Sequence, residues 1–278
     1  MAASRVSELY RTAFVTGAST GLGRAFAEML LADGVRVWGT SRDPARLAPL
    51  AQAYPETFHA VACDLADGPA AAAAFLAAAD RAGGFELVVN NAGYGVFAEF
   101  AGADFPVWQE QIEVMLVATA RLSHAALRAH LARGRGALVN ISSLAAEFPL
   151  PFQSAYNVVK AGLSALNESL LLETAGTAVI VLDVRPGDYR TDFEGSVLRP
   201  QTPPTPRMER AWRAFDRMMR SGPPPAHAAA CLRRALLRQR RGTLRIGRFF
   251  QAVLAPFLAR FGSLDLKRRV QARYFDVG

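Results

Sequence analysis

An alternation of short apolar runs with longer helix-like segments constrains this chain more than any other feature of its sequence. The runs are rich in β-branched and apolar residues and recur from residue 12 to residue 184. The expected strands are Thr12–Thr16, Val35–Thr40, Phe58–Ala62, Leu87–Asn90, Ala137–Ser142 and Ala178–Val184. Right-handed helical crossovers between parallel strands cover both faces of a sheet. The pattern therefore predicts an α/β fold with a doubly wound, Rossmann-type parallel sheet.

The length of the chain fits one such domain with additions towards its C-terminus. A chain of 278 residues can bury one large core, so we expect a single domain over residues 1–278. Residues 188–225 are rich in Pro and Arg, contain a helical segment around Arg207–Met219 and are typical of an insertion that covers a substrate site. The remaining elements expected are a helix, a short strand and an amphipathic basic tail at Ala226–Arg240, Thr243–Ile246 and 248–278.

The positive charge of the chain is concentrated in its last third. Residues 185–278 hold 20 Lys and Arg against 7 Asp and Glu, whereas residues 1–184 hold 12 against 17. The arginines alternate with Leu, Phe and Ala at helical spacing, which indicates a solvated helix face. We therefore expect no nucleic-acid partner.

The tail carries an apolar stripe flanked by arginines. The stripe consists of Phe249, Phe250, Val253, Leu254, Phe257, Leu258 and Phe261. A membrane-surface or assembly role would explain it, and packing over the domain or into a subunit interface explains it equally well. We expect it to pack on its own protein.

Cysteine usage and hydropathy bear on location. The two cysteines, Cys63 and Cys231, and the lack of an apolar leader before the first expected strand favour a reducing, cytoplasmic setting. No apolar run approaches the roughly 20 residues that cross a bilayer. We expect no transmembrane segment.

A glycine-rich turn follows the first expected strand. The segment Thr16-Gly17-Ala18-Ser19-Thr20-Gly21-Leu22-Gly23 leads into a helix at Arg24–Ala32. Glycines allow a sharp turn and a close approach of the backbone to a pyrophosphate, whose charge is met by free N–H groups and the positive end of the helix. The turn therefore predicts a site for a phosphate-bearing cofactor.

A tyrosine and a lysine stand one helical turn apart later in the chain. Tyr156 and Lys160 share a helix face, and an ammonium near a phenol is expected to lower the phenol's pKa towards the range of a general acid or base. Lys160 and Lys267 are the only lysines in the sequence. Ser143, thirteen residues before Tyr156, follows a strand end, where a hydroxyl could donate to a substrate oxygen. We predict that Ser143, Tyr156 and Lys160 are catalytic.

The end of the second expected strand predicts the cofactor. A carboxylate at this place would bind a ribose 2′-hydroxyl and repel a 2′-phosphate, but the chain has Ser41 and Arg42 there. Both side chains can hydrogen-bond a phosphate, and Arg42 can neutralise it. NADP(H) is therefore favoured over NAD(H).

These segments together resemble the short-chain dehydrogenase/reductase family in its compact form, over about residues 10–195. The shared features are the Gly-x-x-x-Gly-x-Gly spacing of the turn and the Ser, Tyr and Lys above. The resemblance implies that Tyr156 transfers the proton, that Lys160 holds the nicotinamide ribose and tunes Tyr156, and that Ser143 polarises the carbonyl. Residues 39–47 and 149–172 are most similar to the hydroxysteroid and retinol dehydrogenase branch.

Further motifs of the family occur in order. Asp64-Leu65 follows the third expected strand, Asn90-Asn91-Ala92-Gly93 the fourth, and Pro186-Gly187 with Thr191 the sixth. The resemblance implies that Asp64 contacts adenine, that Asn91 to Gly93 line the cofactor channel and that Thr191 binds the carboxamide. The predicted cofactor-binding residues are Gly17, Ser19, Thr20, Gly21, Leu22, Gly23, Ser41, Arg42, Asp64, Leu65, Asn91, Ala92, Gly93, Tyr156, Lys160, Pro186, Gly187 and Thr191.

One residue departs from the family pattern. The family usually has Val-Asn-x-x-Gly in the helix expected at Val107–Leu131, and its Asn helps to hold a water between Lys and solvent. Here the aligned run is Val114-Met115-Leu116-Val117-Ala118. A thioether accepts hydrogen bonds only weakly and donates none. A cofactor-binding protein with weak or lost catalysis is therefore an alternative to an efficient enzyme.

The sequence thus predicts an NADP(H)-dependent oxidoreductase that transfers a hydride between the nicotinamide and a ketone, aldehyde or secondary alcohol. A largely apolar substrate is indicated by apolar residues in the segments expected around the pocket, namely Tyr94, Val96, Phe97, Leu144, Phe148, Phe152, Tyr189, Phe193, Met218 and Met219. The four histidines, His59, His124, His130 and His227, show no metal spacing, so we expect no metal site. The family resemblance implies a homodimer or homotetramer.

Overall fold

A seven-stranded parallel sheet forms the centre of the molecule in the computed structural model, which describes residues 3–191, 194–200 and 203–277. Its strand order is β3-β2-β1-β4-β6-β7-β9. The strands are β1 Thr12–Val15, β2 Arg36–Ser41, β3 Phe58–Ala62, β4 Leu87–Asn90, β6 Gly136–Ile141, β7 Val179–Pro186 and β9 Gly242–Ile246. The strand order reverses between β1 and β4, so the crevice at their carboxyl ends is the place where such sheets bind ligands. The predicted doubly wound α/β fold is confirmed.

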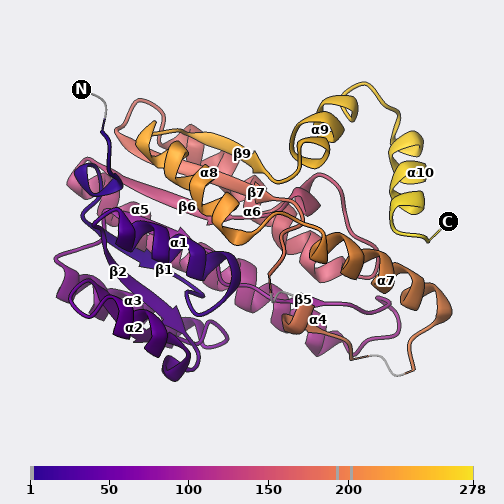
Figure 1. Cartoon of the computed structure of the whole chain (residues 1–278), viewed down its shortest axis with the longest axis horizontal. Coiled ribbons are helices and arrows are strands. Elements are labelled where there is room, and N and C mark those ends of the chain that lie inside the picture. The colour runs from indigo at the N-terminus through magenta and orange to yellow at the C-terminus, as the bar shows by residue number, and fades with distance from the viewer. Residues whose placement is uncertain (1–2, 192–193, 201–202, 278) are drawn as a thin grey trace.

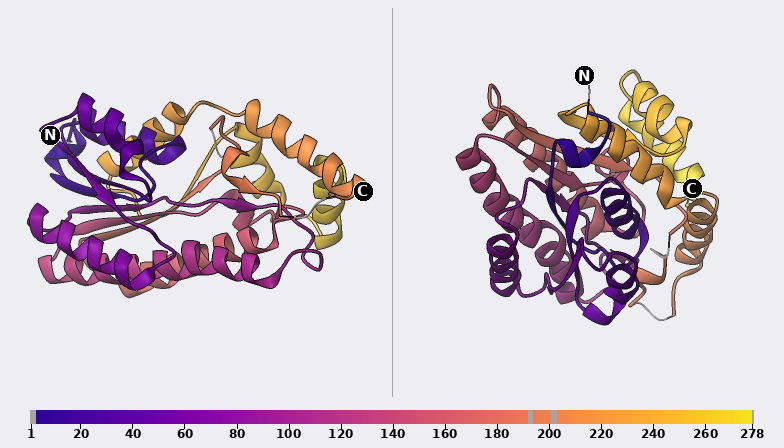
Figure 2. Two further views of the ribbon diagram at one scale, coloured as in Figure 1. Left: turned by 90° about the horizontal axis from the view of Figure 1, so that it is seen from below. Right: turned by 60° about the vertical axis from the view of Figure 1, so that its left-hand side comes forward.

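Successive side chains of the strands point to opposite faces of the sheet and bury two separate cores. Val15, Val37 and Val89 pack with α1 and α8, whereas their neighbours Phe14, Trp38 and Val88 pack with α3, α5 and α6. Figure 2 shows helices on both sides of the strands. The covering helices are α1 Gly21–Ala32, α2 Ala48–Ala53, α3 Gly68–Ala82, α5 Ala118–Arg133, α6 Ser154–Glu173 and α8 Pro225–Leu237. Full burial of each large side chain contributes about 1.5–3 kcal/mol to the fold.

The helix expected at Val107–Leu131 is interrupted. It consists of α4 Phe105–Ile112, a π-helical turn η3 Glu113–Val117 and α5 Ala118–Arg133. A π-helical turn shifts the backbone hydrogen bonds by one residue and is frequent at functional sites. Met115 lies in this turn, so the departure from the family pattern coincides with a departure from regular helix.

Shorter elements join the sheet to the additions at one end of the molecule. Strands β5 Gly95–Val96 and β8 Val197–Leu198 pair in a second, two-stranded sheet, which the sequence did not predict. The expected helix around Arg207–Met219 is α7 Pro206–Arg220, and the tail folds as η6 Phe250–Leu254, α9 Ala255–Leu258 and α10 Leu264–Tyr274. The remaining short helices are η1 Val6–Glu8, η2 Pro44–Leu47, η4 Leu144–Ala146 and η5 Glu194–Ser196. The tail and α7 lie at the end of the molecule far from the N-terminus (Figures 1 and 2).

The apolar stripe of the tail is largely exposed in the single chain, so the prediction that it packs on its own protein would require a subunit interface. Phe249 is 71 % exposed, Phe257 56 % and Phe261 77 %. The helices of the tail are short and join the domain through polar side chains on their inner side, which leaves these rings outside.

Candidate active site

One large cleft lies at the carboxyl ends of the sheet strands. Its volume is about 1240 Å³, above the roughly 300–1,000 Å³ of a typical small-molecule pocket, so it has room for a dinucleotide and a second molecule. Every predicted catalytic and cofactor-binding residue lines it except Gly23. The fold therefore brings together side chains from the first strand to the seventh.

The glycine-rich turn between β1 and α1 forms a cradle that a side chain would fill. Gly17 has φ +67°, and a Cβ on it would lie 2.9 Å from the Cα of Ala92. A Cβ on Gly23 would lie 2.2 Å from the carbonyl oxygen of Gly17. Gly23 therefore packs against the backbone of the turn and does not line the cleft. Helix α1 begins at Gly21 without a side-chain cap, so its first N–H groups remain available to an anion. This cradle fits the pyrophosphate of a dinucleotide.

Hydrogen bonds from the fourth strand fix the cradle in place. The side-chain nitrogen of Asn91 donates to the carbonyl of Thr16 at 3.1 Å, and the backbone N–H groups of Asn91 and Ala92 donate to the Thr16 hydroxyl at 2.9 and 3.0 Å. Asn91 thus joins β1 to β4 at the switch point of the sheet, besides lining the cleft.

Two guanidinium groups stand beside the end of β2. Arg42 and Arg46 both line the cleft, and Arg46 was not among the residues expected from the sequence. The carboxylate of Asp43, between them, accepts the backbone N–H of Ala45 at 3.0 Å as the cap of η2 and does not line the cleft. Ser41 lines the cleft, and its hydroxyl accepts the N–H of Asp43 at 3.3 Å. This end of the cleft is therefore positively charged.

Ser143 and Tyr156 meet inside the cleft. Ser143 precedes η4 as its N-cap, where its hydroxyl accepts the N–H of Ala145 at 3.0 Å, and it is hydrogen-bonded to the hydroxyl of Tyr156. Burial raises the pKa of Tyr156 to about 12, the Ser143 hydrogen bond opposes this rise, and the Asp188 carboxylate adds to it. The lowered phenol pKa expected from the sequence is thus wrong for the protein without cofactor, because removal from water outweighs the neighbouring groups.

Lys160 lies under the Tyr156 ring rather than against its hydroxyl. Its ammonium nitrogen is 5.4 Å from the ring centroid and donates to the carbonyl of Ile141 at 2.8 Å. Burial lowers the pKa of Lys160 to about 8, and the nearby Asp183 carboxylate opposes that fall. Asp183 is itself fully buried, and accepts hydrogen bonds from Ser142, Ser164 and Arg185. A buried, well-bonded carboxylate therefore helps to keep the amine charged.

Met115 occupies the site of the family asparagine with almost no exposure. Its sulfur accepts the backbone N–H of Tyr94 at 3.4 Å, and its methyl group fills the space beside Gly93, where a Cβ would lie 2.8 Å from it. The side chain of Gln111 donates to the carbonyl of Tyr94 at 2.7 Å. Met115 therefore packs against the cofactor channel and lines the cleft, but it supplies no amide to it.

The insertion and the tail close the other side of the cleft. The sequence did not predict that the tail would line it. Gln251 in η6 donates to the carboxylate of Asp188, and its side-chain nitrogen is 3.0 Å from the hydroxyl of Tyr274 in α10. Burial raises the pKa of Asp188, while Gln251 and Arg248 oppose that rise. Asp188 follows the Pro186-Gly187 motif directly, so a signal for its place was present in the sequence, whereas nothing there indicated that Gln251 reaches it.

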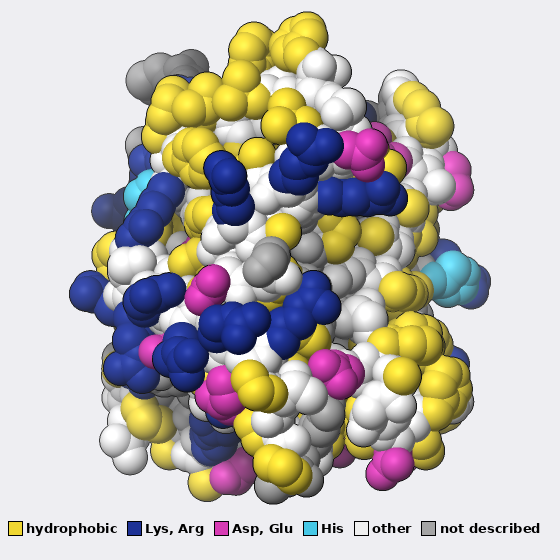
Figure 3. Space-filling view, turned by 90° about the vertical axis from the view of Figure 1, so that its right-hand side faces the viewer, with side chains coloured by type: hydrophobic (Ala, Val, Ile, Leu, Met, Phe, Trp, Pro, Cys, Tyr) yellow, Lys and Arg dark blue, Asp and Glu magenta, His cyan; other side chains and the backbone are white. Residues whose placement is uncertain are grey.

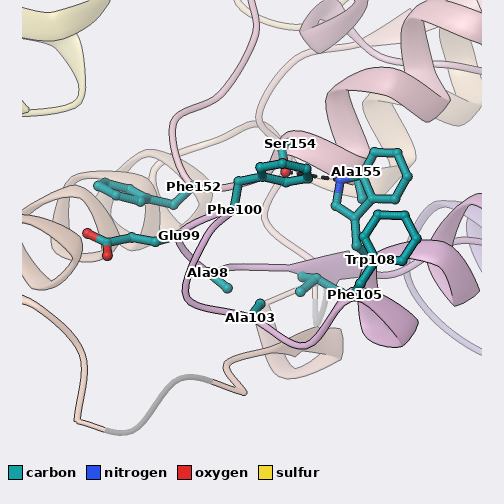
Figure 4. A pocket seen from close by; sticks show the side chains of 10 residues that line it. Ala98, Glu99, Phe100, Ala103, Phe105, Trp108, Phe152, Ser154 and Ala155 are labelled. Carbon is teal, nitrogen blue, oxygen red and sulfur yellow. Dashed lines mark hydrogen bonds between the residues drawn. The ribbon is translucent and has the colours of Figure 1, made fainter.

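Only some of the apolar residues expected around the pocket line the large cleft. Tyr94, Leu144, Phe148, Tyr189 and Met219 line it, whereas Phe97 is part of a core with α7 and Met218 belongs to neither. Phe193 lies outside the described residues. Val96 and Phe152 border a second hollow together with Ala98, Glu99, Phe100, Ala103, Phe105, Trp108, Ser154 and Ala155 (Figure 4). That hollow has a volume of about 20 Å³, which suits about one water molecule and no substrate.

Neither a metal centre nor a membrane span is found in the described part of the chain. No group of three or more His, Cys, Asp or Glu side chains within residues 3–191, 194–200 and 203–277 could hold a metal ion. Within the same residues, no helix has the length and apolar composition needed to cross a bilayer.

Comparisons with known proteins agree with this geometry. The short chain dehydrogenase family model matches residues 11–202. An uncharacterized oxidoreductase of Myxococcus xanthus is 37 % identical over 187 residues, which are 66 % of this chain and 74 % of that protein. Serine 3-dehydrogenase of Agrobacterium fabrum is 31 % identical over 183 residues, 66 % of this chain and 73 % of the enzyme.

The fold match extends further than the sequence match. The crystal structure of a short-chain dehydrogenase from Streptomyces avermitilis has a TM-score of 0.83 and 30 % identity, and the match covers 97 % of both chains. Since the family model spans well over half of the sequence, from the glycine-rich turn past the Pro-Gly motif, the chain belongs to the short-chain dehydrogenase/reductase family of oxidoreductases.

Proposed function

We propose that this oxidoreductase uses NADP(H) to reduce a ketone or aldehyde, or to oxidise the matching alcohol, with Tyr156 as its acid and base. One observation carries the proposal: the hydrogen-bonded Ser143 and Tyr156 hydroxyls stand beside Lys160 in the same cleft as the glycine cradle. The cradle and the reacting hydroxyl belong to one cavity, as a reaction between a bound dinucleotide and a small molecule requires.

The residues of the cleft have separate roles in this reaction. The bound nicotinamide supplies or accepts the hydride. Ser143 donates a hydrogen bond to the substrate oxygen, where negative charge develops during reduction. Tyr156 gives its proton to that oxygen, and its raised pKa keeps the hydroxyl protonated at neutral pH. The positive charge of Lys160 under the ring stabilises the phenolate that remains.

The preference for NADP(H) is supported by the charge at the end of β2. Arg42 and Arg46 line the cleft there, and the carboxylate of Asp43 is occupied by the cap of η2. A 2′-phosphate would meet two guanidinium groups, each able to make charge-assisted hydrogen bonds. Asp64 would contact the adenine, Thr191 would bind the carboxamide and Gly93 would line the channel between them, as the family resemblance implies.

An apolar substrate is supported by the composition of the substrate side of the cleft. Leu144, Phe148, Tyr189 and Met219 line it, and residues 188–225 contribute to its cover. Polar side chains on this side include Asp188, which lies close to Tyr156, and Gln251 and Lys267 from the tail. We therefore propose a moderately large, mainly apolar carbonyl compound, such as the substrates of the hydroxysteroid and retinol dehydrogenase branch that the sequence resembles.

We also propose that the protein self-associates as a homodimer or homotetramer and works in a reducing compartment, namely the cytoplasm. Leu131 on α5 and Val158 and Leu172 on α6 are exposed apolar side chains outside the tail that a partner subunit would cover. Cys63 and Cys231 are both free thiols, as a reducing compartment favours.

The decisive experiment is NADPH oxidation measured against a panel of ketones, aldehydes and steroids, with NADH as the comparison. The proposal expects turnover on at least one apolar carbonyl compound and a clear preference for NADPH. Turnover with NADH alone would contradict the cofactor assignment. Tight NADPH binding without turnover on the whole panel would favour the second candidate, a cofactor-binding protein with weak catalysis, for which the thioether of Met115 in the channel is the supporting observation.

A further inference from the structure

The tail exposes an unusual share of the large apolar side chains on the molecular surface. Eleven of the nineteen exposed large hydrophobic residues within the described part of the chain lie between residues 249 and 274. They form what we name the tail face: Phe249, Phe250, Val253, Leu254, Phe257, Leu258, Phe261, Leu264, Leu266, Val270 and Tyr274. Scattered exposed apolar residues are normal, but a concentration of this kind marks a contact surface.

The inner side of the tail is already bound to the domain. The ammonium of Lys267 donates to the carbonyl of Glu147 and lies 4.7 Å from the centroid of the Phe148 ring. The side chain of Gln271 donates to the carbonyl of Pro149 at 3.0 Å. These polar contacts fix one side of α10 to the domain, while the members of the tail face remain exposed.

The charge around the tail face is strongly positive. Five exposed arginines accompany it, Arg248, Arg260, Arg268, Arg269 and Arg273, against two exposed aspartates, Asp265 and Asp276. In Figure 3, apolar side chains gather at the top of the view, and Lys and Arg side chains lie directly beneath them. Apolar side chains rimmed by arginines are the composition of surface-bound amphipathic helices.

The tail face also surrounds part of the cleft. Six of its members, Phe250, Leu258, Phe261, Leu266, Val270 and Tyr274, line the large cavity as well as being exposed. The mouth of the cleft and the tail face are therefore continuous, and a surface that covers one adjoins the other.

We propose that the tail face binds an anionic lipid surface, with the mouth of the cleft turned towards the lipid. A second copy of the chain is a poorer occupant, because a two-fold interface places the same patch on both sides and would bring the two sets of arginines together. An anionic surface instead complements them, and each arginine near such a surface contributes about fivefold to binding. The orientation of the mouth rests on the proposed function, because apolar substrates partition into lipid. Lipid binding itself does not depend on the proposed function.

Flotation of the purified full chain with vesicles tests the proposal directly. We expect binding to vesicles of phosphatidylcholine mixed with phosphatidylglycerol, much less binding to phosphatidylcholine alone, and weakening in high salt because charge contributes. The double variant F249S/F257S should lose at least tenfold in vesicle binding, since neither residue lines the cleft and both are exposed. R268A/R269A should also lose more than tenfold.

Matched variants separate this surface from exposed residues in general. Leu76 on α3 and Phe100 are also exposed apolar residues, and Arg81 and Arg128 are exposed basic residues on α3 and α5. L76S/F100S and R81A/R128A should bind vesicles like the wild type. Melting temperatures of all four double variants should stay close to that of the wild type, which shows that they fold.

Two outcomes overturn the proposal. One is a wild-type protein that does not float with anionic vesicles; if F249S/F257S then also changes the sedimentation of the free protein, the tail face is a subunit interface. The other is an F249S/F257S variant that floats like the wild type. A protein that floats as expected but shows no turnover on any carbonyl compound would refute the proposed function and leave lipid binding intact.

Turnover tests the orientation of the mouth. An apolar ketone dissolved in anionic vesicles should be reduced faster by the wild type than by F249S/F257S, while both should reduce a water-soluble ketone at equal rates. Equal rates on the vesicle-borne ketone, with flotation lost only in the variant, would show that the mouth does not face the lipid.

Discussion

The two regions that form the cleft differ in how they hold their side chains. In the β/α region, up to Pro186, the site residues are tied to the sheet by short internal hydrogen bonds, such as Asn91 to Thr16 and Lys160 to Ile141. In the tail, six of the cleft residues are themselves exposed. The family model ends at residue 202, so sequence similarity follows the first region. We name the first the rigid region and propose that it carries the chemistry, and that the tail adapts the same cavity to a particular substrate and surface.

The largest expected effect tests the rigid region. Tyr156→Phe removes only the hydroxyl that bonds Ser143 and that we propose to transfer the proton. Turnover should fall by about 10²- to 10⁴-fold, because general acid–base groups contribute that much. NADPH binding, measured by fluorescence titration, should change little. Near-normal turnover in this variant would move the chemistry away from Tyr156.

The second effect concerns the interior of the same region. His130 on α5 is fully buried, and burial lowers its pKa to about 4, below the 6.5 expected in the unfolded chain, with Arg133 adding to the fall. His130 is therefore neutral in both states above about pH 6.5 and costs no stability there. As the pH falls towards 4, protonation of the unfolded chain lowers the free energy of unfolding by about 3 kcal/mol.

Denaturant titrations at several pH values measure this contribution. Between about pH 7 and pH 4.5, His130→Leu should lose clearly less stability than the wild type. His124→Leu is the matched control, since His124 lies on the same helix but is exposed, and it should keep the wild-type slope. Identical slopes for all three proteins would show that His130 is not held neutral by the core.

The third effect lies at the edge of the rigid region. Arg42→Ala should weaken NADPH binding roughly tenfold to hundredfold, because it removes the charge-assisted contact that we propose to the 2′-phosphate, worth about 1.5–3 kcal/mol. NADH binding to the same variant is the control and should stay unchanged. An unchanged dissociation constant for NADPH would refute the role of Arg42.

The sequence predicted the rigid region well and the tail poorly, for physical reasons. Strands such as Phe58–Ala62 and Leu87–Asn90 were placed at their observed bounds because apolar runs and turn residues are local signals. The glycine-rich turn and Ser143 were placed in the cleft by the order of strands, since parallel strands end at one edge, whereas Asp64, Asn91 to Gly93 and Thr191 followed from the family resemblance. The contact between Gln251 and Asp188 joins distant segments through an irregular stretch, and no local pattern encodes it.

Two errors of prediction concern the state of single residues that the sequence did identify. The direction of the Tyr156 pKa shift depends on how completely the phenol leaves water, which the spacing to Lys160 does not reveal. The π-helical turn at Met115 spans only five residues, too few to appear as a break in the helical pattern, so the pattern predicted one uninterrupted helix. In both cases the sequence identified the residue, and only the packing around it determined its state.

The fourth effect tests the tail. Gln251→Ala removes the donor that holds the Asp188 carboxylate, so Asp188 should lose its fixed position in the cleft. The KM for the best carbonyl substrate should rise about twofold to tenfold, as expected for one hydrogen bond, with a smaller change in kcat. Gln271→Ala is the control, because Gln271 bonds Pro149 and not Asp188. Equal KM values for both variants would show that Asp188 does not contact substrate.

The smallest expected effect on turnover is at Met115. This departure from the family pattern lies inside the rigid region, where the sequence otherwise follows the family. The amine of Lys160 donates to the carbonyl of Ile141, and the family resemblance implies that an amide at position 115 would help to hold a water between Lys160 and solvent. Met115→Asn should therefore raise turnover only about threefold, the equivalent of less than 1 kcal/mol. It should also lower the melting temperature, because the sulfur contact to Tyr94 and the methyl packing beside Gly93 are lost.

Met115→Leu separates these two consequences, since it keeps the apolar volume and offers no hydrogen-bonding group. We expect its turnover and melting temperature to stay close to those of the wild type. If Met115→Asn proves as stable as Met115→Leu and turns over no faster, the missing amide does not limit the enzyme. If Met115→Leu itself turns over more slowly, the weak acceptor sulfur at the N–H of Tyr94 positions the channel, and the π-helical turn is then an adaptation to methionine rather than a remnant of a lost relay.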